Sequence, residues 1–291
     1  MLKLTQIALT KHSSGFTLVE VAVVVCILGL VLGFGITSTM AYRQIEQQRT
    51  TVAKLTGVDA ALVDFVTRNR RLPCPADGTL ASAAANAGRE QRDGAGNCLP
   101  GVVTNGVVPW ITLGLTEADA SDAWYNRITY RVPSGNPGFT QDLSVDMAGC
   151  DPAGTAAVTP GPPISCTACT LATLASCTSP ANYLASRGLR IEDGAGVILM
   201  DPTQGTGAAY ILISHGATGA GAYTSSGALL PGTVPPGTAE TQNQNGRAIQ
   251  TTYFDAPMLD ATGVTHFDDI VSRPSFMSVI SKAQLGPRAA Q

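Results

Sequence analysis

The stretch that decides the fold is Gly15-Phe16-Thr17-Leu18-Val19-Glu20, which leads into a run, residues 21–36, that carries no charge. A helix of about 20 apolar residues spans the hydrocarbon core of a bilayer. Residues 16–41 therefore predict a transmembrane helix at the start of the mature chain. Glu20 is the exception within it, because a carboxylate in apolar surroundings is costly and usually marks function.

The order of these features differs from that of an ordinary secretory signal. Such a signal is cut after its apolar region, next to small residues. Here the small residue Gly15 comes before the apolar region, and residues 1–15 are polar and mildly basic. Cleavage at Gly15 would leave the apolar segment on the mature chain. We therefore expect residues 1–15 to be a leader that is removed.

The motif G-F-T-L-V-E followed by an apolar helix resembles the class III signal of type IV prepilins and pseudopilins. The resemblance implies that a prepilin peptidase cuts between Gly15 and Phe16 and methylates Phe16. Glu20 would be the assembly residue that aligns an incoming subunit with the one already in place. The implied partners are the peptidase, other pilin or pseudopilin subunits and the inner membrane. The implied location is the bacterial inner membrane, with a single pass, a periplasmic head, and incorporation into a pilus or pseudopilus.

Residues 42–73 have the pattern of an amphipathic helix. Apolar side chains recur at steps of three and four residues, namely Ile45, Val52, Leu55, Val58, Leu62, Phe65 and Val66. Pro73 and Pro75 are expected to end the helix. The basic cluster Arg68, Arg70 and Arg71 suits a helix C-terminus, and a surface- or DNA-binding patch is the alternative. The net charge of −3 gives no general attraction for nucleic acid.

Residues 74–291 predict an extracytoplasmic globular head. Strand-like runs at 127–132, 189–192, 197–200 and 208–214 favour an antiparallel sheet of about four strands, with a hairpin turn at 193–196. The long helix should lie across one face of this sheet, and a short helix should begin near Pro274. The predicted fold class is thus α+β and pilin-like, with long disulfide-stapled loops. Residues 121–132 resemble the D-P-W-G-N-P-Y turn and strand of major pseudopilins.

The seven cysteines divide into one and six. Cys26 lies in the apolar segment and is expected to act as a small hydrophobic residue. An even number in an exported domain predicts three disulfides, formed among Cys74, Cys98, Cys150, Cys166, Cys169 and Cys177. Cys74 and Cys98 are expected to pair, and the other pairings stay open. The Cys166-x-x-Cys169 spacing leaves a zinc site or redox chemistry as alternatives.

Residues 213–221 and the later Asp268-Asp269-Ile270 resemble the calcium-binding region of some pseudopilins. Asp268 and Asp269 are the candidate ligands, although Thr218 stands where a ligand aspartate is expected. No other metal and no cofactor is expected. Ser214 and His215 are adjacent on a strand and would point to opposite faces, so they do not predict a nucleophile–base pair. Without a catalytic motif, the sequence predicts that the chain is not an enzyme.

Composition agrees with a loop-rich exported protein, since charged residues are only 13% and there are 31 glycines and 18 prolines. The function predicted is a structural minor subunit of a type IV pilus or type II secretion pseudopilus. The large head and its long loops favour a minor over a major subunit. The alternative is a filament-displayed adhesin or binding module for a surface, a substrate or a partner protein. A membrane-tethered enzyme is a third hypothesis, and the kind of machine stays open.

Overall fold

The computed structural model describes residues 15, 17–134, 138–142, 144–145, 183–184, 186–247, 252–259 and 263–285, without the side chains of residues 30–41. The chain divides into two compact units, Met1–Glu46 and Gln47–Gln291. Each unit is described by itself below. The second unit is called the head.

Helix α1 (Leu18–Asn69) contributes to both units. It ends where Arg70 adopts a φ of 55°, a left-handed conformation that cannot continue a helix. Within the head its apolar stripe is buried, with Leu55, Val58, Leu62, Phe65 and Val66 between 0 and 5% exposed. The earlier positions Ile45 and Val52 of the same pattern are 47% and 51% exposed. The amphipathic pattern thus becomes buried only from Leu55 onward.

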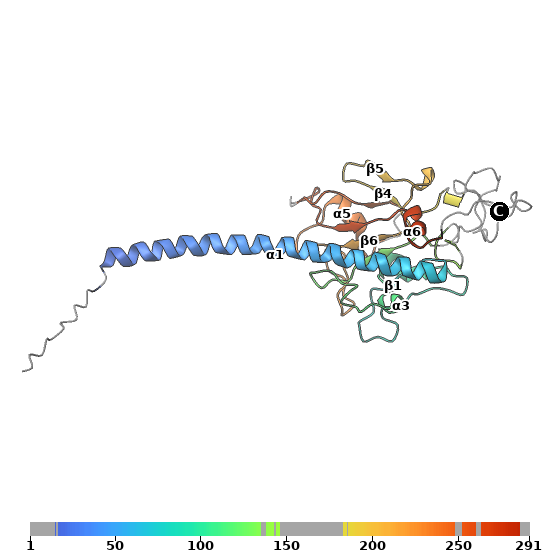
Figure 1. Cartoon of the computed structure of the whole chain (residues 1–291), viewed down its shortest axis with the longest axis horizontal. Helices are drawn as coiled ribbons and strands as arrows, with labels where there is room; N and C mark the ends of the chain where they lie inside the picture. The colour runs from blue at the N-terminus through green and yellow to red at the C-terminus, as the bar shows by residue number, and fades with distance from the viewer. Residues whose placement is uncertain are drawn as a thin grey trace, which may run out of the picture. The chain divides into compact units, whose positions relative to one another are not determined.

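The main sheet of the head has five strands in the order β1-β2-β3-β6-β8, and each neighbouring pair is antiparallel. Its strands are β1 (Ala76–Asp77), β2 (Gly106–Val107), β3 (Thr129–Arg131), β6 (Ile211–Ser214) and β8 (Ile270–Ser272). The central strands are in register with Tyr130 opposite Leu212 and Ile213 opposite Val271. Strand β6, apolar and fully buried, lies between β3 and β8 (Figure 1).

A second sheet has three strands in the order β5-β4-β7. Its strands are β4 (Arg190–Glu192), β5 (Ile198–Met200) and β7 (Thr252–Phe254). Strands β4 and β5 form the hairpin that the turn at 193–196 predicts, but β7 pairs with β4 in parallel. The prediction of one small antiparallel sheet is therefore wrong. Strand β4 takes a partner some 60 residues further along the chain, and local patterns carry no signal for such a pairing.

Short helices connect and cover the two sheets. They are α2 (Pro100–Asn105), α3 (Trp110–Leu113), the 3₁₀ turn η2 (Pro202–Gln204), α5 (Thr238–Asn243) and α6 (Phe276–Lys282). Helix α6 begins at Ser275, whose hydroxyl accepts a hydrogen bond from the Ser278 N–H at 3.3 Å. It lies beside α1, where Lys282 pairs with Asp59 at 2.8 Å (Figure 1).

The main core lies between α1, α6 and the five-stranded sheet. Tyr130 and Tyr210 meet edge to face with ring centroids 5.9 Å apart, and both side chains are fully buried. The Tyr130 hydroxyl donates to the Pro73 carbonyl at 3.0 Å and so holds the segment that follows α1 against the sheet. Each large apolar side chain buried here contributes roughly 1.5–3 kcal/mol. This core fixes α1 to the head from Leu55 onward.

The structure corrects the predicted membrane segment. In the part of the chain that is described, none of the helices combines the length and the apolar character needed to cross a membrane. The predictions of a transmembrane helix and of a single-pass inner-membrane location are therefore wrong.

The structure also corrects the predicted disulfide-stapled loops. The described residues contain one disulfide, Cys74–Cys98, which closes a loop with a sequence separation of 24. Along the chain, strand β1 precedes Cys98 and helix α2 follows it. Both cysteines are buried in the main core, so the disulfide and the core packing together hold this loop in place. Four of the cysteines expected to form disulfides lie outside the described residues, namely Cys150, Cys166, Cys169 and Cys177. Loops stapled by several bridges are not what the described head contains.

Candidate functional site

The first candidate site is the N-terminal turn of α1, where Thr17 and Glu20 bond to each other reciprocally. The Thr17 N–H and hydroxyl both donate to Glu20 Oε2 at 3.0 Å, and the Glu20 N–H donates back to Thr17 Oγ1 at 3.3 Å. This is a capping box, which satisfies N–H groups that have no partner within the helix. The backbone and then the side-chain hydrogen bond from Thr17 lower the pKa of Glu20. The carboxylate is thus ionised and held at the start of the helix.

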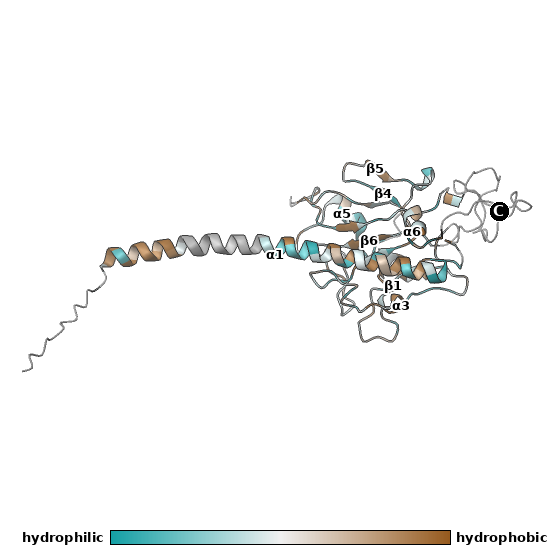
Figure 2. Cartoon of the chain, in the orientation of Figure 1, coloured by the Kyte–Doolittle hydropathy of each residue, from teal (hydrophilic) through white to brown (hydrophobic). Residues whose placement is uncertain are grey.

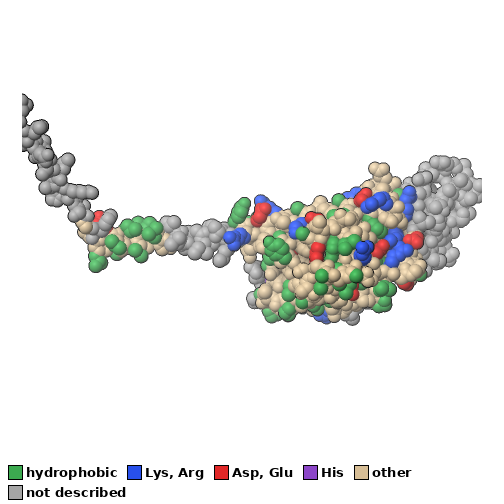
Figure 3. Space-filling view, turned by 90° about the horizontal axis from the view of Figure 1, so that it is seen from below, with side chains coloured by type: hydrophobic (Ala, Val, Ile, Leu, Met, Phe, Trp, Pro, Cys, Tyr) green, Lys and Arg blue, Asp and Glu red, His purple; other side chains and the backbone are tan. Residues whose placement is uncertain are grey.

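Apolar side chains surround this fixed carboxylate and are open to solvent. Leu18 is 86% exposed and Val19 69%, and the exposed residues that follow are Val21, Val23, Val24, Val25, Ile27 and Leu28. Figure 2 colours most of this first part of α1 as hydrophobic, and Figure 3 shows green hydrophobic side chains gathered there. Exposed apolar patches of this kind mark surfaces that contact another molecule. Cys26 lies among them and is also exposed.

Of the two residues expected at the processing site, Gly15 is described and Phe16 lies outside the described residues. A Cβ atom added at Gly15 would meet nothing within 4 Å. Packing within this chain therefore gives no reason for glycine at this position. Nor is a left-handed backbone angle found there, since Gly15 is not among the residues with positive φ.

The second candidate site is a group of buried polar side chains in contact with one another at the end of β6. His215 is fully buried, its Nε2 lies 2.9 Å from Thr129 Oγ1, and its Nδ1 lies 3.3 Å from Asp269 Oδ1. Asn243 donates to the other oxygen of Asp269 at 2.8 Å. Burial raises the pKa of Asp269, while His215 and Asn243 act in the opposite direction. The neighbouring Ser214 donates instead to Asp122 at 2.7 Å, so Ser214 and His215 take separate partners.

Next to this group of side chains lie Glu240, His266 and Asp268. Their possible metal-ligand atoms lie within 4.8 Å of one another. His266 Nε2 lies 3.7 Å from Glu240 Oε2 and 3.9 Å from Asp268 Oδ1. Burial, then the nearby Asp269 and Asp268, raises the pKa of Glu240 to about 8. Such a group holds a proton at neutral pH, and the three donors also suit a divalent ion that accepts one nitrogen and two carboxylates.

The calcium candidates Asp268 and Asp269 have different partners. Asp268 accepts from the Thr218 N–H at 2.8 Å and the Thr218 hydroxyl at 2.9 Å, whereas Asp269 faces His215 and Asn243. Calcium needs six to eight oxygen ligands, and these contacts do not assemble such a set. Sequence reasoning missed Glu240 and His266, because neither lies in a motif and Glu240 is far from Asp268 along the chain.

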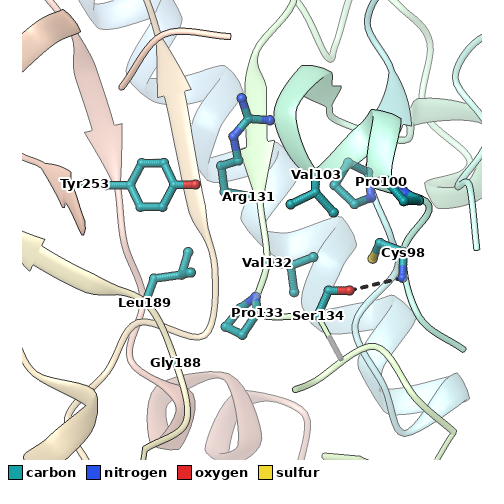
Figure 4. Close-up of a pocket in the computed structure, with 11 residues that line it drawn as sticks. Cys98, Pro100, Val103, Arg131, Val132, Pro133, Ser134, Gly188, Leu189 and Tyr253 are labelled. Carbon is teal, nitrogen blue, oxygen red and sulfur yellow. Dashed lines mark hydrogen bonds between the residues drawn. The ribbon is translucent and has the colours of Figure 1, made fainter. Parts of the chain in front are cut away.

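The third candidate site is a cavity of about 430 Å³ in the head. Figure 4 shows its walls, with Tyr253 of β7 and Leu189 on one side and Pro100 and Val103 of α2 on the other. Arg131, at the end of β3, is the charged residue of the lining. Sequence reasoning did not single out Arg131 or Tyr253, since they belong to different sheets and only the packing of the head brings them together.

The basic cluster at the end of α1 has structural partners. Arg71 forms two hydrogen bonds with Glu90, at 2.9 and 2.7 Å, and its guanidinium lies 5.0 Å from the centre of the Phe65 ring. Arg68 pairs with Asp64 one turn earlier at 2.6 Å. Two of the three arginines thus fasten the end of the helix to itself and to the loop closed by Cys74–Cys98.

Comparison with known proteins yields no relative. No family model, no curated protein and no solved structure matches this chain.

Proposed function

We propose that the chain is a structural subunit of a filament of the type IV pilus or type II secretion pseudopilus class. A prepilin peptidase removes residues 1–15, and the helix that begins at Leu18 packs against the same helix of other subunits. The observation that carries this proposal is the exposed apolar start of α1 with an ionised Glu20 fixed in its first turn. A free-standing chain gains nothing from such a surface, but a filament buries it.

Gly15 supports the processing step. Its surroundings in this chain leave room for a side chain, so the demand for glycine comes from outside the fold. A peptidase that binds the chain in an extended form and tolerates only a small residue at the cut supplies that demand. Phe16 then becomes the N-terminal residue, and its methylation follows from the resemblance to prepilins.

Glu20 has two roles that an experiment can separate. Within its own subunit it caps the helix through Thr17, and a glutamine at this position also completes a capping box. In a filament its charge meets the N-terminal amine of a neighbouring subunit, since a carboxylate brought among apolar side chains needs a cation beside it. Glutamine fulfils the first role and abolishes the second.

The test uses the full chain expressed in its native host, with filaments sheared from the cells and the N-terminus of the protein read by mass spectrometry. The parent is expected to begin at a methylated Phe16 and to sediment with filaments. Gly15→Val is expected to keep residues 1–15 attached. Glu20→Gln is expected to be processed normally and yet to be lost from filaments.

The matched control is Glu46→Gln, an exposed glutamate on the same helix, which should be processed and incorporated like the parent. Thr17→Ala removes the cap but leaves the charge, and incorporation should persist. A protein that still begins at Met1 would refute the processing step. Normal incorporation of Glu20→Gln would refute the docking role and reduce Glu20 to a helix cap.

A further inference from the structure

The cavity in the head has apolar walls and one charged residue. Its walls are built by prolines, valines, a leucine and the ring of Tyr253, among them Pro75, Pro100, Val103, Val132 and Leu189. The volume of about 430 Å³ lies in the range of pockets for small ligands. Figure 4 shows the Tyr253 hydroxyl directed toward the side chain of Arg131 across this space.

Arg131 is only 5% exposed. Its guanidinium donates to the carbonyl oxygens of Gly106 at 3.1 Å and Thr104 at 2.9 Å, and to Asn245 Oδ1 at 2.7 Å. All three acceptors are neutral. Among the described residues no carboxylate forms an ion pair with Arg131, whereas Arg71, Arg127, Arg190 and Arg273 each have one. A buried charge is normally paired with an opposite charge.

The positive charge of Arg131 is therefore held in place by neutral dipoles, with no counter-ion among the residues that the structure describes. Burial lowers the pKa of Arg131, and the Tyr253 hydroxyl acts against that shift. An arginine nevertheless stays protonated under ordinary conditions. A guanidinium has five N–H groups, and the three hydrogen bonds to neutral oxygens leave donors for Tyr253 and for a ligand.

We propose that this cavity binds a carboxylate that carries a small apolar body. The carboxylate lies against Arg131 and the Tyr253 hydroxyl, and the apolar body lies against the proline, valine and leucine wall. The charge of the ligand supplies the counter-ion that the described head lacks. The proposal concerns the head alone and does not depend on assembly into a filament.

Two sources offer this chemistry, a free small acid and the C-terminus of a peptide with an apolar last residue. The probes are therefore N-acetyl-leucine, its amide, a hexapeptide ending in Val-Leu with a free carboxylate, and the same peptide amidated. Binding to the full chain is measured by isothermal titration calorimetry at pH 7. Both acids are expected to bind, and both amides are expected to bind at least tenfold more weakly, because a hydrogen bond to a charged group is lost.

Three variants locate the binding. Arg131→Gln is expected to weaken the acids tenfold to a hundredfold and to leave the amides unchanged. Val103→Phe fills the cavity from the α2 side and should weaken both acids without removing a charge. The matched control is Arg190→Gln, because Arg190 already pairs with Glu192 at 2.6 Å and does not line the cavity. It should bind like the parent.

The measured affinities distinguish the two ligand sources and can also overturn the proposal. Peptide binding at least tenfold tighter than that of N-acetyl-leucine assigns the site to a chain terminus, and equal binding assigns it to a small acid. Equal affinity for acids and amides, or no binding of any probe at 10 mM, would overturn the proposal. If Arg131→Gln fails to fold by circular dichroism, Val103→Phe decides instead, and unchanged acid binding in that variant refutes the site.

Discussion

Both halves of α1 carry apolar side chains, but these side chains have opposite environments. Its first turns present apolar side chains to solvent, with Leu28 53% exposed, whereas Leu62 in its last turns is fully buried. The second half meets the sheet and α6 of its own head, and the described chain gives the first half no such contact. Hydrophobic residues on a helix therefore specify a need for burial but do not say which molecule meets it.

The same contrast between exposed and buried apolar side chains distinguishes the first unit from the head. The head satisfies its apolar stripe internally and builds its polar clusters around β6. In the first unit, the described apolar side chains and the Glu20 carboxylate are exposed. Experiments that weaken one half and compare it with the other test this division directly.

The largest difference is expected for truncation of matched leucines. Leu62→Ala should lower the free energy of unfolding by about 2–5 kcal/mol, because it opens a cavity in a packed core. Leu28→Ala should change it by less than about 0.5 kcal/mol, as for other exposed positions. Urea unfolding followed by circular dichroism provides the measurement. A comparable loss for both variants would mean that the first half of α1 is also packed within the chain.

A second comparison concerns cysteines in the two units. The double change Cys74→Ser and Cys98→Ser should cost about 3 kcal/mol, since it frees a loop of moderate length in the unfolded chain. Cys26→Ser, on the exposed part of α1, should have almost no effect. Thermal unfolding with and without reductant measures both. The comparison fails if reductant destabilises the double variant as much as the parent.

The buried acid cluster makes the stability of the head depend on pH. Glu240 ionises near 4.5 when unfolded and near 8 when folded, because burial and the facing Asp268 and Asp269 disfavour its charge. The folded state thus holds a proton that the unfolded chain releases. Its contribution is fully present below about pH 4.5 and declines as the pH rises through about 8.

Glu240→Gln should remove this decline and make the head more stable than the parent at pH 8.5, by on the order of 2 kcal/mol. Asp268, Asp269, His215 and His266 remain in both proteins, so the difference between the two pH profiles reports the ionisation of Glu240 together with its coupling to Asp268 and Asp269. Glu46→Gln is the control and should keep the slope of the parent. Parallel profiles for Glu240→Gln and parent would contradict the raised pKa.

The smallest effect is expected at the start of α1. Thr17→Ala removes the donors that lower the pKa of Glu20, so the pKa should return toward its ordinary value of 4.5. The first turn should also fray, because its N–H groups lose their cap. An NMR titration of the Glu20 carboxyl and amide exchange in the first turn measure the two effects. An unchanged pKa would mean that another group fixes this carboxylate.

The sequence predicted well where the signal was local. The three- and four-residue steps from Leu55 to Val66 place the buried stripe, Asp193 begins the turn of the β4–β5 hairpin, and α6 begins close to Pro274. Prediction of a single antiparallel sheet failed because β4 pairs with the distant strand β7, a contact that local patterns do not encode. Prediction of a membrane segment was also wrong, since none of the described helices is long and apolar enough to cross a membrane.

By itself, the sequence determined the apolar stripe of the amphipathic part of α1 and singled out Glu20 near the start of the helix, because periodicity and local motifs act within a few residues. Only the tertiary structure placed β7 beside β4, Arg131 opposite Tyr253, and Glu240 next to His266 and Asp268. These contacts join residues far apart along the chain. The free energy of burying them belongs to the packed head as a whole, and no short segment encodes it.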